Sequence, residues 1–162
     1  ADIFKKLRID HVISLCPTCV HFIKNEYKKL IGDSIDNAVD ASQFFISQEP
    51  LFNNRHSGLK IIYHDPCHAV YNLNIRHEPR TILQNLGYSL IEPKERGCCG
   101  FAGTFSLLYQ RLSRDMLELR ANNYMEADMV VTSCPNCVLQ LESRIKDKPV
   151  KHIIEIIKEA LR

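Results

Sequence analysis

Seven cysteines constrain this 162-residue chain more than any other feature of its sequence. Four of them form two C-x-x-C pairs and two are adjacent, and together they are Cys16, Cys19, Cys67, Cys98, Cys99, Cys134 and Cys137. An odd number suits a complete disulfide framework poorly, and thiols grouped in this way in a chain without a signal peptide indicate metal binding or thiol redox chemistry. We therefore expect a protein of the reducing cytoplasm.

The charge and the hydrophobic patterning argue against two other classes of function, nucleic-acid binding and membrane spanning. The net charge is +2, and lysine and arginine are scattered among acidic residues rather than gathered in a block. No apolar run approaches the ~18 residues that indicate a membrane span. We therefore expect no nucleic-acid partner and no direct membrane span.

Hydrophobic patterning predicts an α/β fold, a largely parallel sheet flanked by helices, because strand-like and helix-like segments alternate. Short apolar, β-branched runs predict strands at 10–16, 59–65 and 129–133, with a weaker one at 88–92. Helical patterns cover 17–31, 79–86, 104–124, 135–145 and 150–161. Within 104–124, a stripe at helical spacing is interpreted as core packing: Phe105, Leu108, Leu112 and Met116.

An internal repeat divides the chain. Residues 10–20 match residues 128–138, and each copy runs from a predicted strand through C-P-x-C into a predicted helix. The second copy is preceded by Cys67 and by the Cys98–Cys99 pair, whereas the first has no such residues before it. We therefore predict the end of a first repeat at 1–47, a loop or linker at 48–58, and a complete second repeat at 59–162 of a two-repeat protein.

The second repeat is expected to gather its five cysteines. Cys67 and Cys134 follow predicted parallel strands, whose carboxyl ends meet at the edge where α/β proteins bind ligands. A thiol at the start of a helix ionises readily, and thiolates bind soft metals. The glycines around Cys98 and Cys99 allow a tight backbone path, so that both adjacent side chains can face one centre.

These motifs resemble a known family. Cys67, the Cys98-Cys99-Gly100 triplet and the C-P-N-C at 134–137 are similar to the cysteine-rich CCG domain, and residues 63–68 and 78–80 match it as well. That domain occurs twice in each of two subunits of heterodisulfide reductase. It also occurs in the iron–sulfur subunits of glycolate oxidase, anaerobic glycerol-3-phosphate dehydrogenase and lactate-utilisation complexes.

The resemblance implies an oxidoreductase or electron-transfer subunit with an iron–sulfur cluster, of the non-cubane [4Fe–4S] type in the heterodisulfide reductase members. All five cysteines of the complete repeat would hold it: Cys67, Cys98, Cys99, Cys134 and Cys137. Cys16 and Cys19 would belong to a second, incomplete site. The implied partners are flavoprotein or ferredoxin-like subunits, with a disulfide or quinone as acceptor, and any association with a membrane would run through them.

Alternatives remain open. A structural zinc site would make the domain an interaction module, and four protein ligands are usual for zinc. A thioredoxin-like C-x-x-C disulfide would leave Cys67, Cys98 and Cys99 unexplained. His64 and His68, which flank Cys67, are read either as ligands or proton donors or as supporting and capping residues.

Further side chains near the cysteines also admit two readings. Arg80 and Arg96 either offset thiolate charge or bind an acidic substrate, or they form surface salt bridges, which are the commoner role of arginine. Phe101 and Phe105 are candidates for shielding a cluster. No catalytic residue is assigned.

Overall fold

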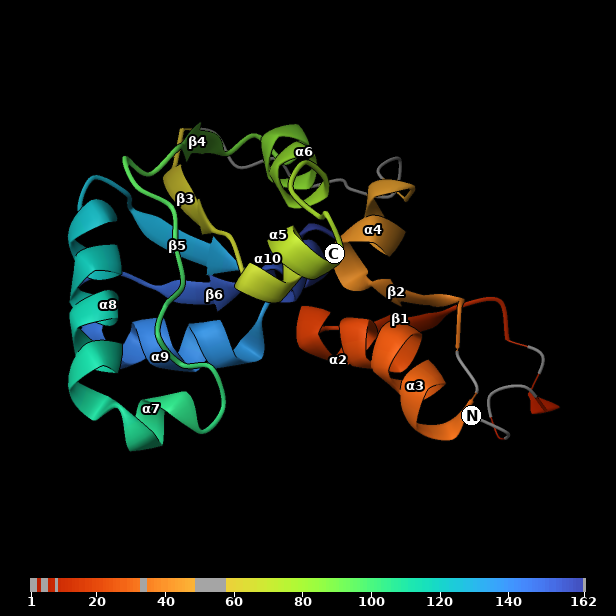
Figure 1. Ribbon diagram of the computed structural model, residues 1–162. Helices are drawn as coiled ribbons and strands as arrows, with labels where there is room; N and C mark the ends of the chain where they lie inside the picture. The colour runs from red at the N-terminus through yellow and green to blue at the C-terminus, as the bar shows by residue number, and fades with distance from the viewer. Residues whose placement is uncertain (1–2, 4–5, 8, 33–34, 49–57, 162) are drawn as a thin grey trace.

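The computed structural model describes residues 3, 6–7, 9–32, 35–48 and 58–161, and these form an α/β fold with two parallel sheets (Figure 1). The strands are β1 (Val12–Ser14), β2 (Ala38–Asp40), β3 (Lys60–His64), β4 (Ser89–Ile91), β5 (Met129–Thr132) and β6 (Val150–His152). The helices are α2 (Pro17–His21), η1 (Phe22–Glu26), α3 (Tyr27–Ile31), α4 (Ala41–Ile46), α5 (Cys67–Asn72), α6 (Glu78–Asn85), α7 (Phe105–Leu108), α8 (Gln110–Asn123), α9 (Pro135–Arg144) and α10 (Ile153–Ala160).

The larger sheet has the order β4-β3-β5-β6, and all its strands run parallel. Successive side chains of a strand point to opposite faces. Ile61 and Tyr63 therefore pack on one face with residues of α6 and α10, whereas Ile62 and Val130 pack on the other with residues of α8 and α9. Helices cover both faces, as the sequence pattern predicts.

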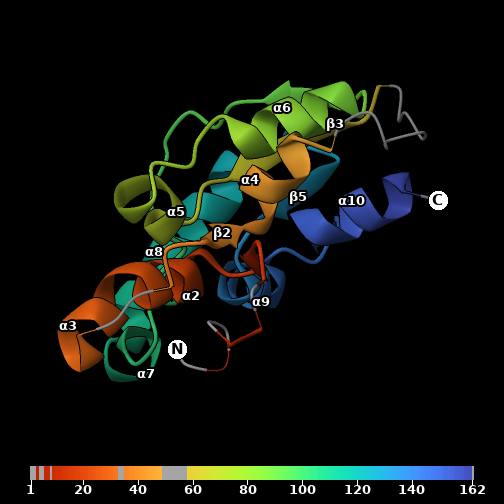
Figure 2. The same cartoon turned by 90° about the vertical axis from the view of Figure 1, so that its right-hand side faces the viewer.

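The repeat extends further than the matching motifs. In the small sheet β2 pairs with β1, and α4 follows β2, just as β6 pairs with β5 and α10 follows β6. Both of these helices are capped, because the Asp40 side chain accepts a hydrogen bond from the Ser42 amide and the His152 side chain accepts one from the Ile154 amide. The two views show α4 beside α6 and α2 beside α5 (Figures 1 and 2).

The predicted strands and most of the predicted helices are confirmed, with two differences. Residues 150–152 form β6 rather than the first turn of a helix, because Pro149 precedes them and its carbonyl accepts the Val130 amide of β5. The predicted helix at 104–124 is broken into α7 and α8 at Tyr109, whose backbone lies outside the helical region (φ −120°, ψ 53°). Helix 17–31 is continuous through a π-helical turn, η1.

The apolar stripe of 104–124 does not pack as predicted. Leu108 and Leu112 are 73% and 52% exposed. The break at Tyr109 turns a different set inward on α8, which consists of Ser113, Leu117, Arg120 and Ala121. Periodicity across the break therefore pointed to the wrong face.

The boundary between the predicted repeats remains a prediction. Most of the expected linker, residues 49–57, lies outside the described residues. The segment before this linker contacts the segment after it, since the ring nitrogen Nε2 of His152 lies 2.9 Å from the Leu15 carbonyl oxygen. Among the helices that the structure describes, each is too short or too polar to cross a membrane.

Candidate metal centre

The five cysteines of the second repeat lie together at the carboxyl edge of the large sheet. Cys67 begins α5 directly after β3, and Cys134 is the N-cap of α9 directly after β5. Because β3 and β5 are parallel neighbours, their ends place these two residues at one edge. Cys137 lies one turn into α9, and Cys98 and Cys99 reach the edge on the loop between β4 and α7.

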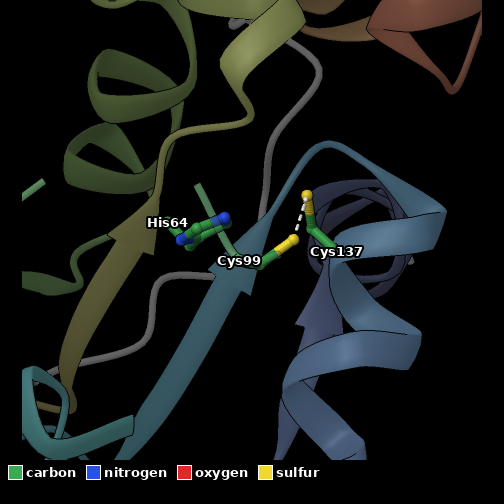
Figure 3. Close-up of side chains that lie close together, drawn as sticks. All are labelled: His64, Cys99 and Cys137. Atoms are coloured by element: carbon green, nitrogen blue, oxygen red, sulfur yellow. Dashed lines mark hydrogen bonds between the residues drawn. The ribbon is translucent and has the colours of Figure 1, made fainter. Parts of the chain in front are cut away.

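The thiols form one continuous series. The sulfur atoms of Cys99 and Cys137 lie 3.5 Å apart (Figure 3). Cys98 is close enough to Cys67 and Cys99 for these thiols to affect its ionisation, and Cys137 affects the ionisation of Cys134 in the same way. The structure thus brings together all five residues that the sequence singles out, from three separate segments.

Cys16 of the first C-P-x-C joins the series, which the sequence did not predict. Its side chain interacts with that of Cys134, and the two residues have similar N-cap conformations (φ −136° and −125°). Cys19 is exposed. The sequence placed Cys16 and Cys19 in a separate incomplete site, and the structure puts Cys16 next to the second-repeat thiols.

The electrostatics of the series favour a mixture of thiols and thiolates. Interaction with Cys67, and then with Cys99, lowers the pKa of Cys98 to about 2, while the same contact raises the pKa of Cys67. Interaction with Cys137 and Cys16 lowers the pKa of Cys134 to about 2. Like charges this close oppose one another, so full ionisation needs a cation among them.

Backbone and apolar groups complete the surroundings. The Gly100 amide donates to the Cys98 sulfur at 3.3 Å. Cys99, Cys134 and Cys137 are buried in a hydrophobic cluster against which Phe101 packs. Shielding of a metal centre by Phe101 stays a prediction. Phe105 instead lies against the ring of Tyr109, with centroids 5.4 Å apart.

The two histidines near Cys67 differ in the thiols that they approach. His64 is buried, and burial lowers its pKa to about 4. One of its ring nitrogens and the sulfurs of Cys99 and Cys137 lie within 4.8 Å of one another (Figure 3). The ring nitrogen Nδ1 of His68 lies 3.6 Å from the Cys67 sulfur.

The two arginines form salt bridges. Arg80 donates to both carboxylate oxygens of Asp65 at 2.8 Å, and it also binds Glu92. Arg96 pairs with Glu92 as well, at 3.0 Å. This network fixes Asp65, two residues before Cys67, and so supports the start of α5.

Tyr124 and Thr132 belong to the surroundings of the centre, although the sequence did not single them out. The Tyr124 hydroxyl lies 2.6 Å from Nδ1 of His64. Thr132 is fully buried beside His64, its register partner on β5. The only signal in the sequence was the place of Thr132, two residues before Cys134 at a strand end.

The donor set fits an iron–sulfur group. Sulfur ligands converge from three segments, and two fully buried polar atoms beside them, His64 Nε2 and Thr132 Oγ1, have no hydrogen-bond partner among the described residues. Buried polar groups are almost always paired in native proteins. A polar group among these thiols would supply that partner.

A fold of this kind with such a thiol edge defines a class of cysteine-rich, metal-binding α/β domains. Residues 61–142, half of the chain, match the family model described as the CCG cysteine-rich domain, and the chain belongs to that family.

Among curated relatives, the chain is 26% identical to a subunit of the fumarate reductase (CoM/CoB) of Methanothermobacter marburgensis, over 91% of the chain and 32% of that protein. It is 28% identical to an uncharacterized iron-sulfur protein of Methanococcus maripaludis, over 99% of the chain and 34% of that protein. It is 29% identical to the lactate utilization protein A of Halalkalibacterium halodurans, over 93% and 69%. The chain thus spans about a third of the length of the first two.

Proposed function

We propose that this chain is part of an electron-transfer subunit of a redox complex and that its five second-repeat cysteines hold an iron–sulfur cluster. The observation that carries the proposal is the gathering of five thiols from three segments at one sheet edge, close enough to affect one another's ionisation. The relatives named above support it, because their names describe a reductase subunit, an iron-sulfur protein and a protein of lactate utilization.

We assign the cluster to the non-cubane [4Fe–4S] type, since five clustered cysteines exceed the four that a cubane cluster or a structural zinc ion uses. When bound, such a cluster accepts and releases single electrons. The protein holds the thiolates in place, and the amides of Asn136 and Cys137 stabilise the negative charge of Cys134. Burial of Cys99 and Cys137 keeps water from the inner side of the site.

The partners belong to the same proposal. The chain would receive or deliver electrons through flavoprotein or ferredoxin-like subunits, with a disulfide or a quinone as the terminal acceptor. Cys16 and Cys19 would contribute to a first-repeat centre, and the contact between Cys16 and Cys134 would bring that centre next to the second.

A structural zinc ion is the second candidate. One observation favours it: the ligand atoms of His64, Cys99 and Cys137 are close enough to bind one ion. With His64 as one of its four ligands, such a zinc ion would leave at least two of the five cysteines of the repeat unused.

Metal analysis distinguishes these functions. The full chain would be purified without oxygen and assayed for iron, acid-labile sulfide and zinc, with electron paramagnetic resonance of the reduced protein. We expect about four iron and four sulfide per chain. Cys99→Ser should abolish both. Cys19→Ser changes an exposed thiol outside the second repeat, so it is the matched control and should keep the iron and sulfide of the second-repeat cluster. One zinc without sulfide would contradict the redox function.

A further inference from the structure

Two polar side chains end side by side at the thiol edge. His64 and Thr132 are register partners on the neighbouring parallel strands β3 and β5, so their side chains share one face of the sheet. The residues two positions earlier, Ile62 and Val130, pack in the hydrophobic cluster that contains Cys99, Cys134 and Cys137. The face that His64 and Thr132 share is therefore the face of the metal centre.

Each side chain carries one polar atom without a partner. His64 is 1% exposed and Thr132 is 0% exposed. His64 Nε2 and Thr132 Oγ1 find no hydrogen-bond partner among the described residues. An unpaired buried polar atom destabilises the folded state, because it has lost its hydrogen bonds to water and gained none in return. Two such atoms at one place indicate a common partner that occupies the site.

Tyr124 determines which tautomer His64 adopts. Its hydroxyl lies 2.6 Å from Nδ1 of His64, and it has no other hydrogen-bond partner within the described part of the chain. A buried hydroxyl must donate its hydrogen to an acceptor, and Nδ1 is the acceptor within reach. The hydrogen of the neutral imidazole therefore resides on Nε2, which makes Nε2 a donor rather than a metal ligand.

We infer that the Nε2–H of His64 and the hydroxyl of Thr132 donate hydrogen bonds to sulfur of the metal centre and so raise its reduction potential. This inference rests on the proposed iron–sulfur function. Hydrogen bonds to the sulfurs of a cluster stabilise its more negative, reduced state and are one of the means by which proteins set the potential. Tyr124 is then a positioning residue, because it acts through the orientation and tautomer of His64.

Variants of the full chain test the inference by redox titration followed by electron paramagnetic resonance. Thr132→Val keeps the shape and removes the hydroxyl, and His64→Leu removes the ring donor. At a fixed potential, each should lower the ratio of reduced to oxidised cluster about tenfold, a shift of about −59 mV for one electron. His64→Gln, whose amide retains an N–H donor, should restore most of the potential.

Tyr63→Phe is the matched control. It removes a buried hydroxyl from the same strand on the opposite face, where that hydroxyl binds Ser133, and it should leave the potential unchanged. A second readout needs no cluster: nitrogen NMR of histidine-labelled protein should show His64 protonated at Nε2 in the wild type.

The possible results distinguish failure of this inference from failure of the proposed iron–sulfur function. Thr132→Val protein that holds its cluster and keeps the wild-type reduction potential would overturn this inference alone. So would a His64 that is protonated at Nδ1. Wild-type protein without iron and sulfide would overturn the proposed function on which it rests. If His64→Leu does not fold, the isosteric Thr132→Val decides the potential.

Discussion

Gly100, which follows the adjacent cysteines, has a backbone conformation that other residues adopt only with strain. Its φ is +85°, in the left-handed region. A Cβ at this position would lie 2.7 Å from the backbone oxygen of Ser113 and 3.2 Å from its Cα. The backbone of Gly100 also makes two hydrogen bonds, one within the loop and one to α8. Its amide donates to the Cys98 sulfur, and its carbonyl accepts a hydrogen bond from the Ser113 hydroxyl. Close contact between the cysteine loop and α8 therefore depends on the missing side chain.

Gly100→Ala is expected to destabilise the fold by about 3 kcal/mol. The left-handed conformation costs roughly 1–2 kcal/mol for a residue with a Cβ, and forcing a methyl group against a backbone oxygen adds about 1–3 kcal/mol. For a chain of this size the melting temperature should fall by roughly 6–12 °C. Because the loop must move away from α8, Cys98 and Cys99 should shift with it, and iron binding should fall as well.

Gly103→Ala provides the matched control. Gly103 also has a positive φ, +58°, but a Cβ there would meet no atom within 4 Å. It should cost only the conformational part, about 1 kcal/mol. Urea unfolding of both variants, with unchanged m-values, measures the difference. If Gly100→Ala loses no more stability than Gly103→Ala, the close approach to Ser113 does not constrain the loop and the reasoning is wrong.

Three further substitutions test the support of the site. Arg80→Lys cannot bind both oxygens of Asp65 and should lose about 2–3 kcal/mol in urea unfolding; Arg144→Lys, at an exposed ion pair, should leave the midpoint unchanged, and equal effects would refute the distinction. His152→Ala removes the α10 cap and should cost about 1–2 kcal/mol by thermal unfolding, a result that an unchanged melting temperature would contradict. Burial raises the pKa of Asp40 above its ordinary value, so the folded state loses stability as pH rises through that pKa. Asp40→Asn should therefore flatten the dependence of stability on pH above the ordinary aspartate pKa of about 3.9. A dependence as steep as that of the wild type would exclude this origin.

The sequence predicted the elements that carry the cysteines, and the reasons are local. Pro17 and Pro135 mark helix starts after apolar strands, and such signals depend only on neighbouring residues. The three-residue strands β2 and β6 were missed because each holds at most two apolar residues, whereas the equally short β1 and β4 lie within longer predicted segments at 10–16 and 88–92. The break at Tyr109 was missed for a related reason, since helical spacing continues across it in the sequence.

The cysteines of the site could be found because their chemistry is rare and their spacing is paired. The groups around them carry no such pattern. Thr132 and His64 are 68 residues apart, and only the register of β3 against β5 places them on one face beside the thiols. Tyr124, at the end of α8, contacts His64 through its hydroxyl and its ring. In a parallel sheet, strand pairing thus determines which polar atoms face a centre that the strand ends create, and a sequence read along one strand at a time does not contain that pairing.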